Sequence, residues 1–368
     1  MNRWVIISID ESGCKETFPM NSDEDITEVR KKARERMKGI CGVYQICDGD
    51  LSRLCQGIKY GKPIGMGGVG KGLSFEANVK ALDRIKLKTR LITQHREPDM
   101  TSQLYGVNIS LPVMTSSVSG VKASMGGSMS ELEFAEAVLQ GALDSDTLGW
   151  IGNTSDEGEE TTGVEALENV GRGIAIFKPQ GNKRLLELIG MAEKAGAIAV
   201  GVDIDGVGST NWERHGKAVY RKSVEDLNEL ADSTDLPFIV KGVMSVEDAL
   251  DAMDAGIQGI DVSNHGGRAL DSTKGVAEVL PMISKAVDGN ITITAGGGVR
   301  TGFDVMKMIA LGADGVLLGR PVIRAAIGGG SNGVKKHFDY IRSDLRRGMI
   351  QTSSNTVEEI TERILDID

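Results

Sequence analysis

Residues 291–321, ITITAGGGVRTGFDVMKMIALGADGVLLGRP, contain the pattern that decides the fold of this chain. Two short apolar runs, ITITAG and GVLLG, flank one helical stretch, TGFDVMKMIALG, and both runs end in glycine. The same alternation extends back along the chain to Pro112. Because two parallel strands need a crossover connection, usually a helix, this alternation predicts a parallel sheet.

Eight such units follow one another, and their apolar runs are residues 111–117, 146–152, 173–177, 197–205, 237–242, 259–264, 291–296 and 315–319. Eight alternating units predict an α/β fold, a (β/α)₈ TIM barrel with an N-terminal cap segment. We expect a leader and cap at 1–110 packed on the barrel, the barrel at 111–345 and a C-terminal helical tail at 346–368, all in one structural domain. The leader is expected to contain a strand at 4–9, helices at 22–40 and 74–87 and a hairpin at 101–110.

The composition excludes several classes of partner. The formal net charge of −10 over 368 residues argues against a nucleic-acid ligand, which needs concentrated Lys and Arg. No apolar run approaches the roughly 20 residues that span a bilayer, and the N-terminus does not have the pattern of a secretory signal. We therefore expect a cytoplasmic protein without a membrane partner.

Four cysteines lie in the leader, and three of them, Cys41, Cys47 and Cys55, fall within fifteen residues. Their spacing matches no common zinc pattern, so we expect reduced thiols and no metal, with a metal or redox site as the less favoured alternative. The glycine-rich segment GMGGVGKG (65–72) lacks the G-K-[ST] ending of a phosphate-binding loop and is expected to be a connection.

The functional residues are expected where strands end, because (β/α)₈ barrels carry their active sites at the carboxyl ends of the strands. The stretch Asp261–Asp271, DVSNHGGRALD, places His265 and Arg268 three residues apart after an apolar run. A histidine can exchange a proton near neutral pH, and an arginine can clamp a carboxylate through two hydrogen bonds. Together they predict a site that deprotonates a small anionic substrate.

Two carboxylates compete for the role of holding the histidine. Asp203 ends the run AVGVD and could orient the imidazole, or it could cap the next turn, and Asp205 is a nearby competitor. Lys241 ends the run PFIVK, and a lysine at a barrel mouth needs an anion or an electron-rich cofactor ring. The turns GGGVR (296–300) and LGRP (318–321) follow the last two strands, where barrels often bind phosphate.

These motifs closely resemble the family of FMN-dependent 2-hydroxy-acid oxidases and dehydrogenases, the glycolate oxidase and lactate oxidase group. The resemblance runs from about residue 75 to 345 and is strongest from Pro237 to Pro321, through VSNHGGRALD and ITAGGGVRTGFDVMKMIALGADGVLLGRP. It implies FMN as cofactor, with His265 as the base, Arg268 as the substrate clamp, Asp203 as the partner of the histidine and Lys241 near flavin N1. The expected cofactor-binding residues are Ser117, Val118, Ser119, Asn153, Lys241, Ser263, Gly297, Gly298, Arg300, Gly319 and Arg320.

The chain also departs from the family pattern. Gly296 stands where the family has an Asp, and the stretch IAIFKPQ places Ala175 or Ile176 at the position of a Gln and Phe177 or Lys178 at that of a Tyr. The loop DIDGVGSTNWERHGK (203–217) lacks the second substrate arginine, and the N-terminal tyrosine of the family has only Tyr44 as a candidate. We expect Lys178, or Arg214 or His215 from that loop, to replace the missing substrate contacts.

The leading hypothesis is an FMN-dependent oxidoreductase that converts a small 2-hydroxy acid to the 2-oxo acid, with proton abstraction by His265 and hydride transfer to flavin N5. The alternative keeps FMN and changes the substrate to a larger, peptide or phosphorylated anion, or the reaction to an isomerisation. A non-enzymatic scaffold is disfavoured, because a scaffold has no need of a base beside an anion clamp. The resemblance also implies a homo-oligomer, a tetramer or an octamer, and it leaves the electron acceptor open.

Overall fold

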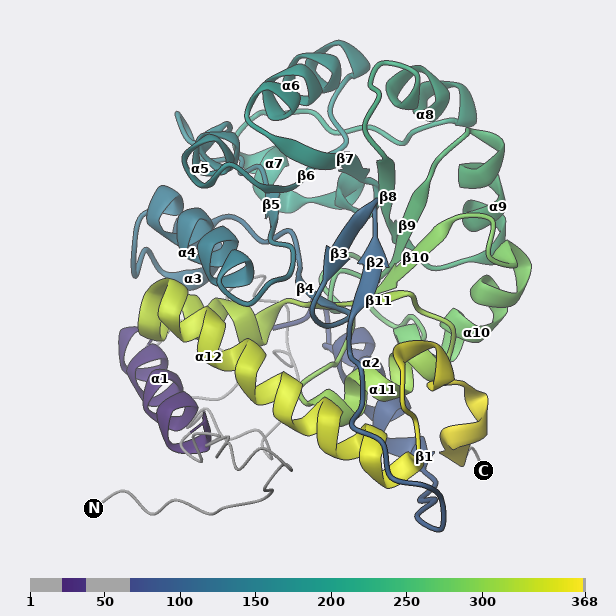
Figure 1. Cartoon of the computed structure of the whole chain (residues 1–368). Coiled ribbons are helices and arrows are strands. Elements are labelled where there is room, and N and C mark those ends of the chain that lie inside the picture. The colour runs from purple at the N-terminus through teal and green to yellow at the C-terminus, as the bar shows by residue number, and fades with distance from the viewer. Residues whose placement is uncertain (1–21, 38–66, 367–368) are drawn as a thin grey trace.

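The computed structural model describes residues 22–37 and 67–366, and its centre is a barrel of eight parallel strands (Figure 1). The strands are β4 (Val113–Thr115), β5 (Trp150–Gly152), β6 (Gly173–Phe177), β7 (Ala197–Asp203), β8 (Phe238–Val243), β9 (Gly259–Val262), β10 (Thr292–Ala295) and β11 (Gly315–Leu318). Their hydrogen-bonded order is β4-β11-β10-β9-β8-β7-β6-β5, so each strand lies beside its neighbour in sequence and the last returns to the first. The gap between β4 and β5 is bridged by a parallel pairing of Val118 with Ile151. The predicted (β/α)₈ barrel is confirmed.

Helices surround the barrel and connect its strands (Figure 1). They are α3 (Val121–Met125), α4 (Glu131–Leu143), α5 (Thr162–Val170), α6 (Asn182–Lys194), α7 (Thr210–Arg214), α8 (Val224–Ala231), α9 (Val246–Asp254), α10 (Val276–Val287), α11 (Gly302–Ala310) and α12 (Arg320–Thr352). Local sequence sets several of their starts: the hydroxyls of Ser130, Ser223 and Thr301 each accept from the backbone N–H three residues on. In each case an acidic side chain at that position accepts from the capping residue in return, which is the reciprocal capping box.

The core consists of two apolar layers. One fills the inside of the barrel with residues such as Met114, Trp150, Ile176 and Leu317, and the other lies between the strands and the helices. The hairpin of β2 (Ser102–Leu104) and β3 (Val107–Ile109) contributes Leu104 and Ile109 to the inner layer. The hairpin predicted at 101–110, with its turn at Tyr105-Gly106, is therefore confirmed, and it plugs one end of the barrel.

The described part of the leader packs on the barrel through two helices. The helix α1 (Ser22–Arg36) lies along α12, where the Arg36 guanidinium donates to the carbonyl of Ile327 at 2.6 Å. The helix α2 (Leu73–Arg84) lies beside α10. Both helices were expected, whereas the strand at 4–9, the four cysteines and Tyr44 lie outside the described residues. A short pairing of β1 (Lys86–Leu87) with β12 (Leu365–Asp366) joins the segment after α2 to the C-terminal end of the described chain. The 3₁₀ turns η2 (Val357–Glu359) and η3 (Glu362–Ile364) precede β12.

The boundaries proposed at 110 and 345 stay a prediction. Across the second of them α12 continues to Thr352, with one break of helical geometry at Gly330. Among the described residues, none of the helices combines the length and the apolar character that crossing a bilayer requires.

A buried histidine in α12 links the stability of the fold to pH. His337 is 1% exposed and stacks on Tyr340, with ring centroids 6.1 Å apart. Burial, together with the nearby guanidinium groups of Arg30 and Arg300, lowers the pKa of His337 to about 3. The folded chain therefore keeps this imidazole neutral at pH values where the unfolded chain protonates it.

We predict that His337→Leu flattens the acid side of the stability profile. In the parent protein the unfolded state binds one proton more than the folded state between about pH 6.5 and pH 3, which costs about 1.4 kcal/mol for each pH unit of acidification. The variant should lose that component, as measured by urea unfolding at a series of pH values. The same substitution at the exposed His95 is the control. Equal slopes in all three proteins would contradict the prediction.

Candidate functional site

A cavity of about 570 Å³ opens at the carboxyl ends of the barrel strands, which is within the usual size range of cofactor and substrate pockets. Of the residues expected at the site, those that line it are Ser117, Val118, Ser119, Asn153, Lys178, Lys241, Ser263, His265, Arg268, Gly297, Gly298, Arg300, Gly319 and Arg320. They come from loops after different strands, which the closed barrel brings together. Asp203 is not part of the lining and lies 3% exposed behind the two lysines.

The loop after β9 has an unusual backbone, and its neighbours explain why it needs two glycines. His265, Gly266 and Gly267 have φ values of 58°, 63° and 78°, so three successive residues adopt the left-handed conformation. A Cβ at Gly267 would stand 2.3 Å from the backbone nitrogen of Phe75 in α2. A Cβ at Gly266 would stand 2.4 Å from a guanidinium nitrogen of Arg320. Glycine tolerates this conformation and this approach, whereas His265 adopts it at a cost in strain.

Residues of α2 hold this loop in place, and the sequence analysis did not identify them. The Asn78 and Asn264 side-chain amides bond each other in both directions, at 2.8 and 3.1 Å. The Asp271 carboxylate accepts from the backbone N–H groups of Lys71, Leu73 and Ser74 at the start of α2. An Asp three residues after the arginine was the only sequence signal for this contact, and it became meaningful only once α2 was placed beside it.

The glycine-rich segment before α2 also lies at the cavity. Gly67, Gly68 and Val69 line its wall, and the backbone N–H of Val69 donates to the carbonyl of Gly267 at 2.9 Å. The sequence analysis expected only a connection here. The segment is therefore a structural neighbour of the His265 loop and not a remote linker.

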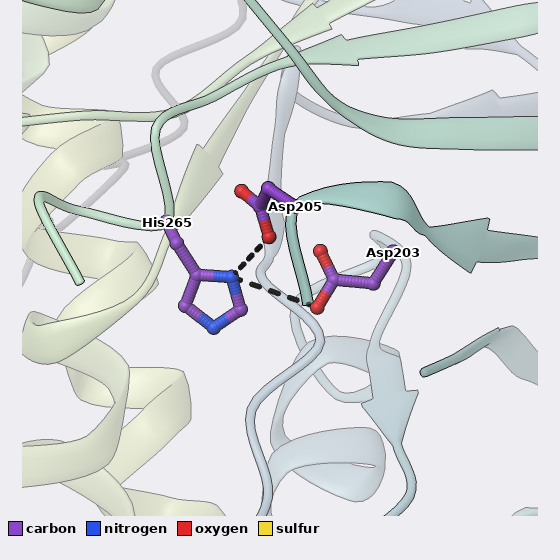
Figure 2. Close-up of side chains that lie close together, drawn as sticks. All are labelled: Asp203, Asp205 and His265. Atoms are coloured by element: carbon purple, nitrogen blue, oxygen red, sulfur yellow. Dashed lines mark hydrogen bonds and ion pairs between the residues drawn. The ribbon is translucent and has the colours of Figure 1, made fainter. Parts of the chain in front are cut away.

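The imidazole of His265 faces two carboxylates at the end of β7 (Figure 2). Its Nδ1 lies 2.7 Å from Oδ1 of Asp205 and 3.5 Å from Oδ2 of Asp203. Asp205 belongs to the 3₁₀ turn η1 (Ile204–Gly208). Gly242, with φ 102°, gives this turn room, since a Cβ there would stand 2.8 Å from the Cβ of Asp205. The nearer partner of the histidine is therefore Asp205, the competitor in the sequence analysis, and not Asp203.

The carboxylate of Asp203 forms ion pairs with two lysines. One of its carboxylate oxygens is ion-paired with Lys178, and the other lies 3.3 Å from Nζ of Lys241. Burial alone would raise the pKa of Asp203, but the two ammonium groups and His265 lower it well below its usual range. Burial likewise opposes the charge on Lys241, yet the carboxylates of Asp203, Asp205 and Asp261 raise the pKa of Lys241. The Lys241 ammonium group is therefore charged at neutral pH, and it shares the Asp203 carboxylate with Lys178.

The other side of the cavity carries the predicted substrate clamp. Arg268 donates from Nη2 to the hydroxyl of Ser124 in α3 at 3.1 Å, which directs its guanidinium along the cavity wall. From the loop after β7, the cavity is lined by Ser209, Asn211 and Trp212. Arg214 and His215 do not line it, and the ring of His215 lies 3.8 Å from Asp156 instead. Arg214 and His215 were offered as alternatives to Lys178 for covering the site, and in this structure the short helix α7 turns Asn211 and Trp212 to the cavity instead.

The end of the cavity near β10 and β11 has the form expected of a phosphate site. Gly297 and Gly298 approach α2 so closely that a Cβ on either would stand within 3.0 Å of Asn78. Gly319 is the residue before α12, whose first turn contains Pro321, so the N–H groups of a long helix begin at the cavity. Arg300 also lines this end, 7% exposed. Arg320 lies across the Phe75 ring at 4.0 Å and donates to the carbonyls of Gly67 and Gly266, so it supports the loop as well.

The two aspartates and His265 form a cluster whose ligand atoms all lie within 4.8 Å of one another, close enough to hold a metal ion. The lysines argue against such an ion, because both oxygens of Asp203 already face ammonium groups. A cation there would also be repelled by Lys178 and Lys241. That the site uses no metal stays a prediction.

Comparison with known proteins identifies the family. The chain matches the model of the FMN-dependent dehydrogenase family over residues 65–223 and 217–367. The chain belongs to this family. It is 30% identical to an L-lactate dehydrogenase of Ectopseudomonas mendocina, over 81% of the chain and 92% of the relative, and 29% identical to a peroxisomal (S)-2-hydroxyacid oxidase of Arabidopsis thaliana, over 80% and 88%. A crystal structure of mandelate oxidase superposes with a TM-score of 0.73 at 27% identity, covering 93% of this chain and 98% of that one.

The cofactor of this family member is FMN, and the described residues fit it. The side-chain nitrogen of Asn153 is buried at the cavity and has no hydrogen-bond partner within the described residues. It can therefore donate a hydrogen bond to a bound cofactor. The glycine turns after β10 and β11 line the cavity, where backbone N–H groups and the start of α12 suit a phosphate. Lys241 places a buried positive charge at the cavity wall, which suits the electron-rich ring of a flavin.

We predict that Asp203→Asn destabilises the protein by about 3–5 kcal/mol, because it removes the nearest ion-pair partner of the buried Lys241. The measurement is denaturant unfolding of the FMN-loaded protein. Asp205→Asn is the matched control, since no lysine is bonded to that carboxylate among the described residues. Equal losses of unfolding free energy in the two variants would show that Asp203 does not stabilise the charges of Lys178 and Lys241.

Proposed function

We propose that this protein oxidises a 2-hydroxy acid to the 2-oxo acid, with FMN as the electron acceptor in the first half of the reaction. The observation that carries the proposal is the position of His265, whose ring faces the cavity beside Arg268 while a carboxylate holds its other nitrogen at 2.7 Å. That is the arrangement of a general base and its orienting partner. The names of the relatives, which act on lactate and on (S)-2-hydroxy acids, support the same substrate class.

In the proposed mechanism Asp205 fixes the proton of His265 on Nδ1, so that Nε2 is free to accept the hydroxyl proton of the substrate. Arg268 holds the substrate carboxylate, with its guanidinium directed by Ser124. Bound FMN supplies the ring whose N5 accepts the hydride equivalent. We therefore propose the orienting role for Asp205, with Asp203 as the partner of the two lysines.

Lys178 has two proposed tasks. It is ion-paired with Asp203 and lines the cavity, where its side chain is 16% exposed. We propose that it binds the substrate anion. It would replace the substrate contacts that the family resemblance implies after β6 and β7. Lys241 is assigned to the flavin, together with Ser117, Val118, Ser119, Asn153, Ser263, Gly297, Gly298, Arg300, Gly319 and Arg320. A cytoplasmic location and a homo-oligomeric assembly remain part of the proposal and rest on the sequence alone.

We predict that His265→Gln retains FMN and loses reduction of the flavin by substrate, by about 10²–10⁴-fold, which is the usual contribution of a general base. Anaerobic stopped-flow bleaching of the flavin by a panel of 2-hydroxy acids measures this. Asp205→Asn should show a smaller loss in the same assay, because it removes only the orientation of the ring. Full reduction by the His265 variant would refute the mechanism.

We predict that Arg268→Met weakens binding of the substrate about 10- to 100-fold, because a charge-assisted hydrogen bond contributes roughly 1.5–3 kcal/mol. Lys178→Met should weaken it by a smaller factor, since its ammonium is shared with Asp203. The dissociation constants come from the concentration dependence of flavin reduction. If no 2-hydroxy acid bleaches the flavin while larger or phosphorylated anions do, the substrate class is the alternative one.

A further inference from the structure

The floor of the cavity contains a carboxyl group that the proposed mechanism does not use. Asp261 lies in β9, two residues before Ser263, so its side chain points to the same inner side of the barrel but one layer deeper. It is 1% exposed and still reaches the cavity wall. In the parallel pairing of β8 with β9 it is the register partner of Lys241. The shorter acidic side chain therefore lies beneath the longer basic one.

The two oxygens of this carboxyl have different surroundings. Oδ1 accepts a hydrogen bond from the hydroxyl of Thr294 at 3.2 Å. Oδ2 is buried without a hydrogen-bond partner in the described part of the chain, and Nζ of Lys241 lies 3.8 Å from it, beyond hydrogen-bonding distance. An ionised carboxyl is costly in such a place, whereas a protonated one is much less so. The geometry is that of a group that can exist in either state.

Charged groups that favour and that oppose ionisation surround Asp261. Lys241 on β8 favours the ionised form, while Asp203 on β7 and Asp205 on the following turn oppose it, and Tyr105 of the hairpin lies below. Burial is the largest influence, and it raises the pKa of Asp261 to about 7 in spite of Lys241 and Thr294. A modest change in the charge at the cavity, next to the Lys241 ammonium group, is therefore enough to change the protonation state of the Asp261 carboxyl.

We propose that Asp261 takes up one proton from solvent when the bound FMN is reduced and releases it on reoxidation. A hydride adds two electrons and one proton to the flavin and so leaves one extra negative charge on it. That charge competes with Asp261 for Lys241 and disfavours a second anion nearby. The balance is complete: the substrate gives its hydride to FMN and its hydroxyl proton to His265, and a solvent proton converts the Asp261 carboxylate to the acid.

The inference rests on FMN binding with Lys241 near the ring, as in the proposed function, but it does not depend on the substrate. Its test therefore uses chemical reduction with dithionite and no hydroxy acid. A failure to oxidise hydroxy acids would leave this test intact, and a failure of this test would leave the proposed reaction intact.

The experiment measures proton uptake per two electrons in weakly buffered anaerobic solution, together with the midpoint potential as a function of pH. Just above about pH 7, two-electron reduction of the parent protein should be accompanied by uptake of nearly two protons. Its midpoint potential should therefore fall with pH about twice as steeply as that of a protein that takes up one proton. Asp261→Asn should take up one proton and show the shallower slope. Asp314→Asn is the control, because desolvation also raises the pKa of that carboxyl, but Asp314 is exposed, precedes β11 and does not line the cavity.

A second variant and a second measurement cover the case in which Asp261→Asn loses FMN. Thr294→Val removes the hydrogen bond that favours the ionised form, so the pH window of extra uptake should move upward. In the FMN-free protein, infrared titration should show one carboxylic acid band that disappears near neutral pH and is missing in Asp261→Asn. The proposal is overturned if the parent and Asp261→Asn proteins take up equal numbers of protons, if Thr294→Val leaves the window unchanged, or if the band persists in the Asp261 variant.

Discussion

The site depends on the balance of charge around two lysines at the mouth of the barrel, of which Lys241 is buried and Lys178 is half-buried. The ammonium groups of Lys178 and Lys241 lie against Asp203, with Asp261 beneath and Asp205 beside them. A lone ammonium at this depth would be neutralised or would prevent folding, because the cost of burying an unpaired charge is large. The aspartates make it possible to keep positive charge at the cavity wall, where an electron-rich ring and an anionic substrate both need it.

That balance also explains how the work is divided between two neighbouring carboxylates. Asp203 is engaged by lysines through both oxygens, and it lies 3.5 Å from the imidazole of His265, farther than Asp205. Asp205 is two residues further along, in η1, and contacts His265 at 2.7 Å, and Gly242 leaves room for that turn. A protein that needs both a buried cation pair and an oriented base thus uses one acidic group for each.

A second constraint is the close approach of α2 to the loop after β9. Two glycines, the paired amides of Asn78 and Asn264 and the carboxylate of Asp271 bring a helix of the leader against the residues that carry the base. The leader is therefore part of the site and not only a cover for it.

The sequence by itself determined the barrel and the family, and it named many of the residues that line the cavity. Eight apolar runs that end in glycine or polar residues are a local pattern, and the closure of the sheet then brings their ends to one place. The sequence did not determine which partner each charged group takes. Asp203 and Asp205 are two residues apart and chemically equivalent, and only their position relative to Lys178, Lys241 and His265 separates them. The same holds for Asn78, Asp271 and Asp261, whose roles depend on elements distant in sequence, because burial and hydrogen bonding are set by what packs against a side chain.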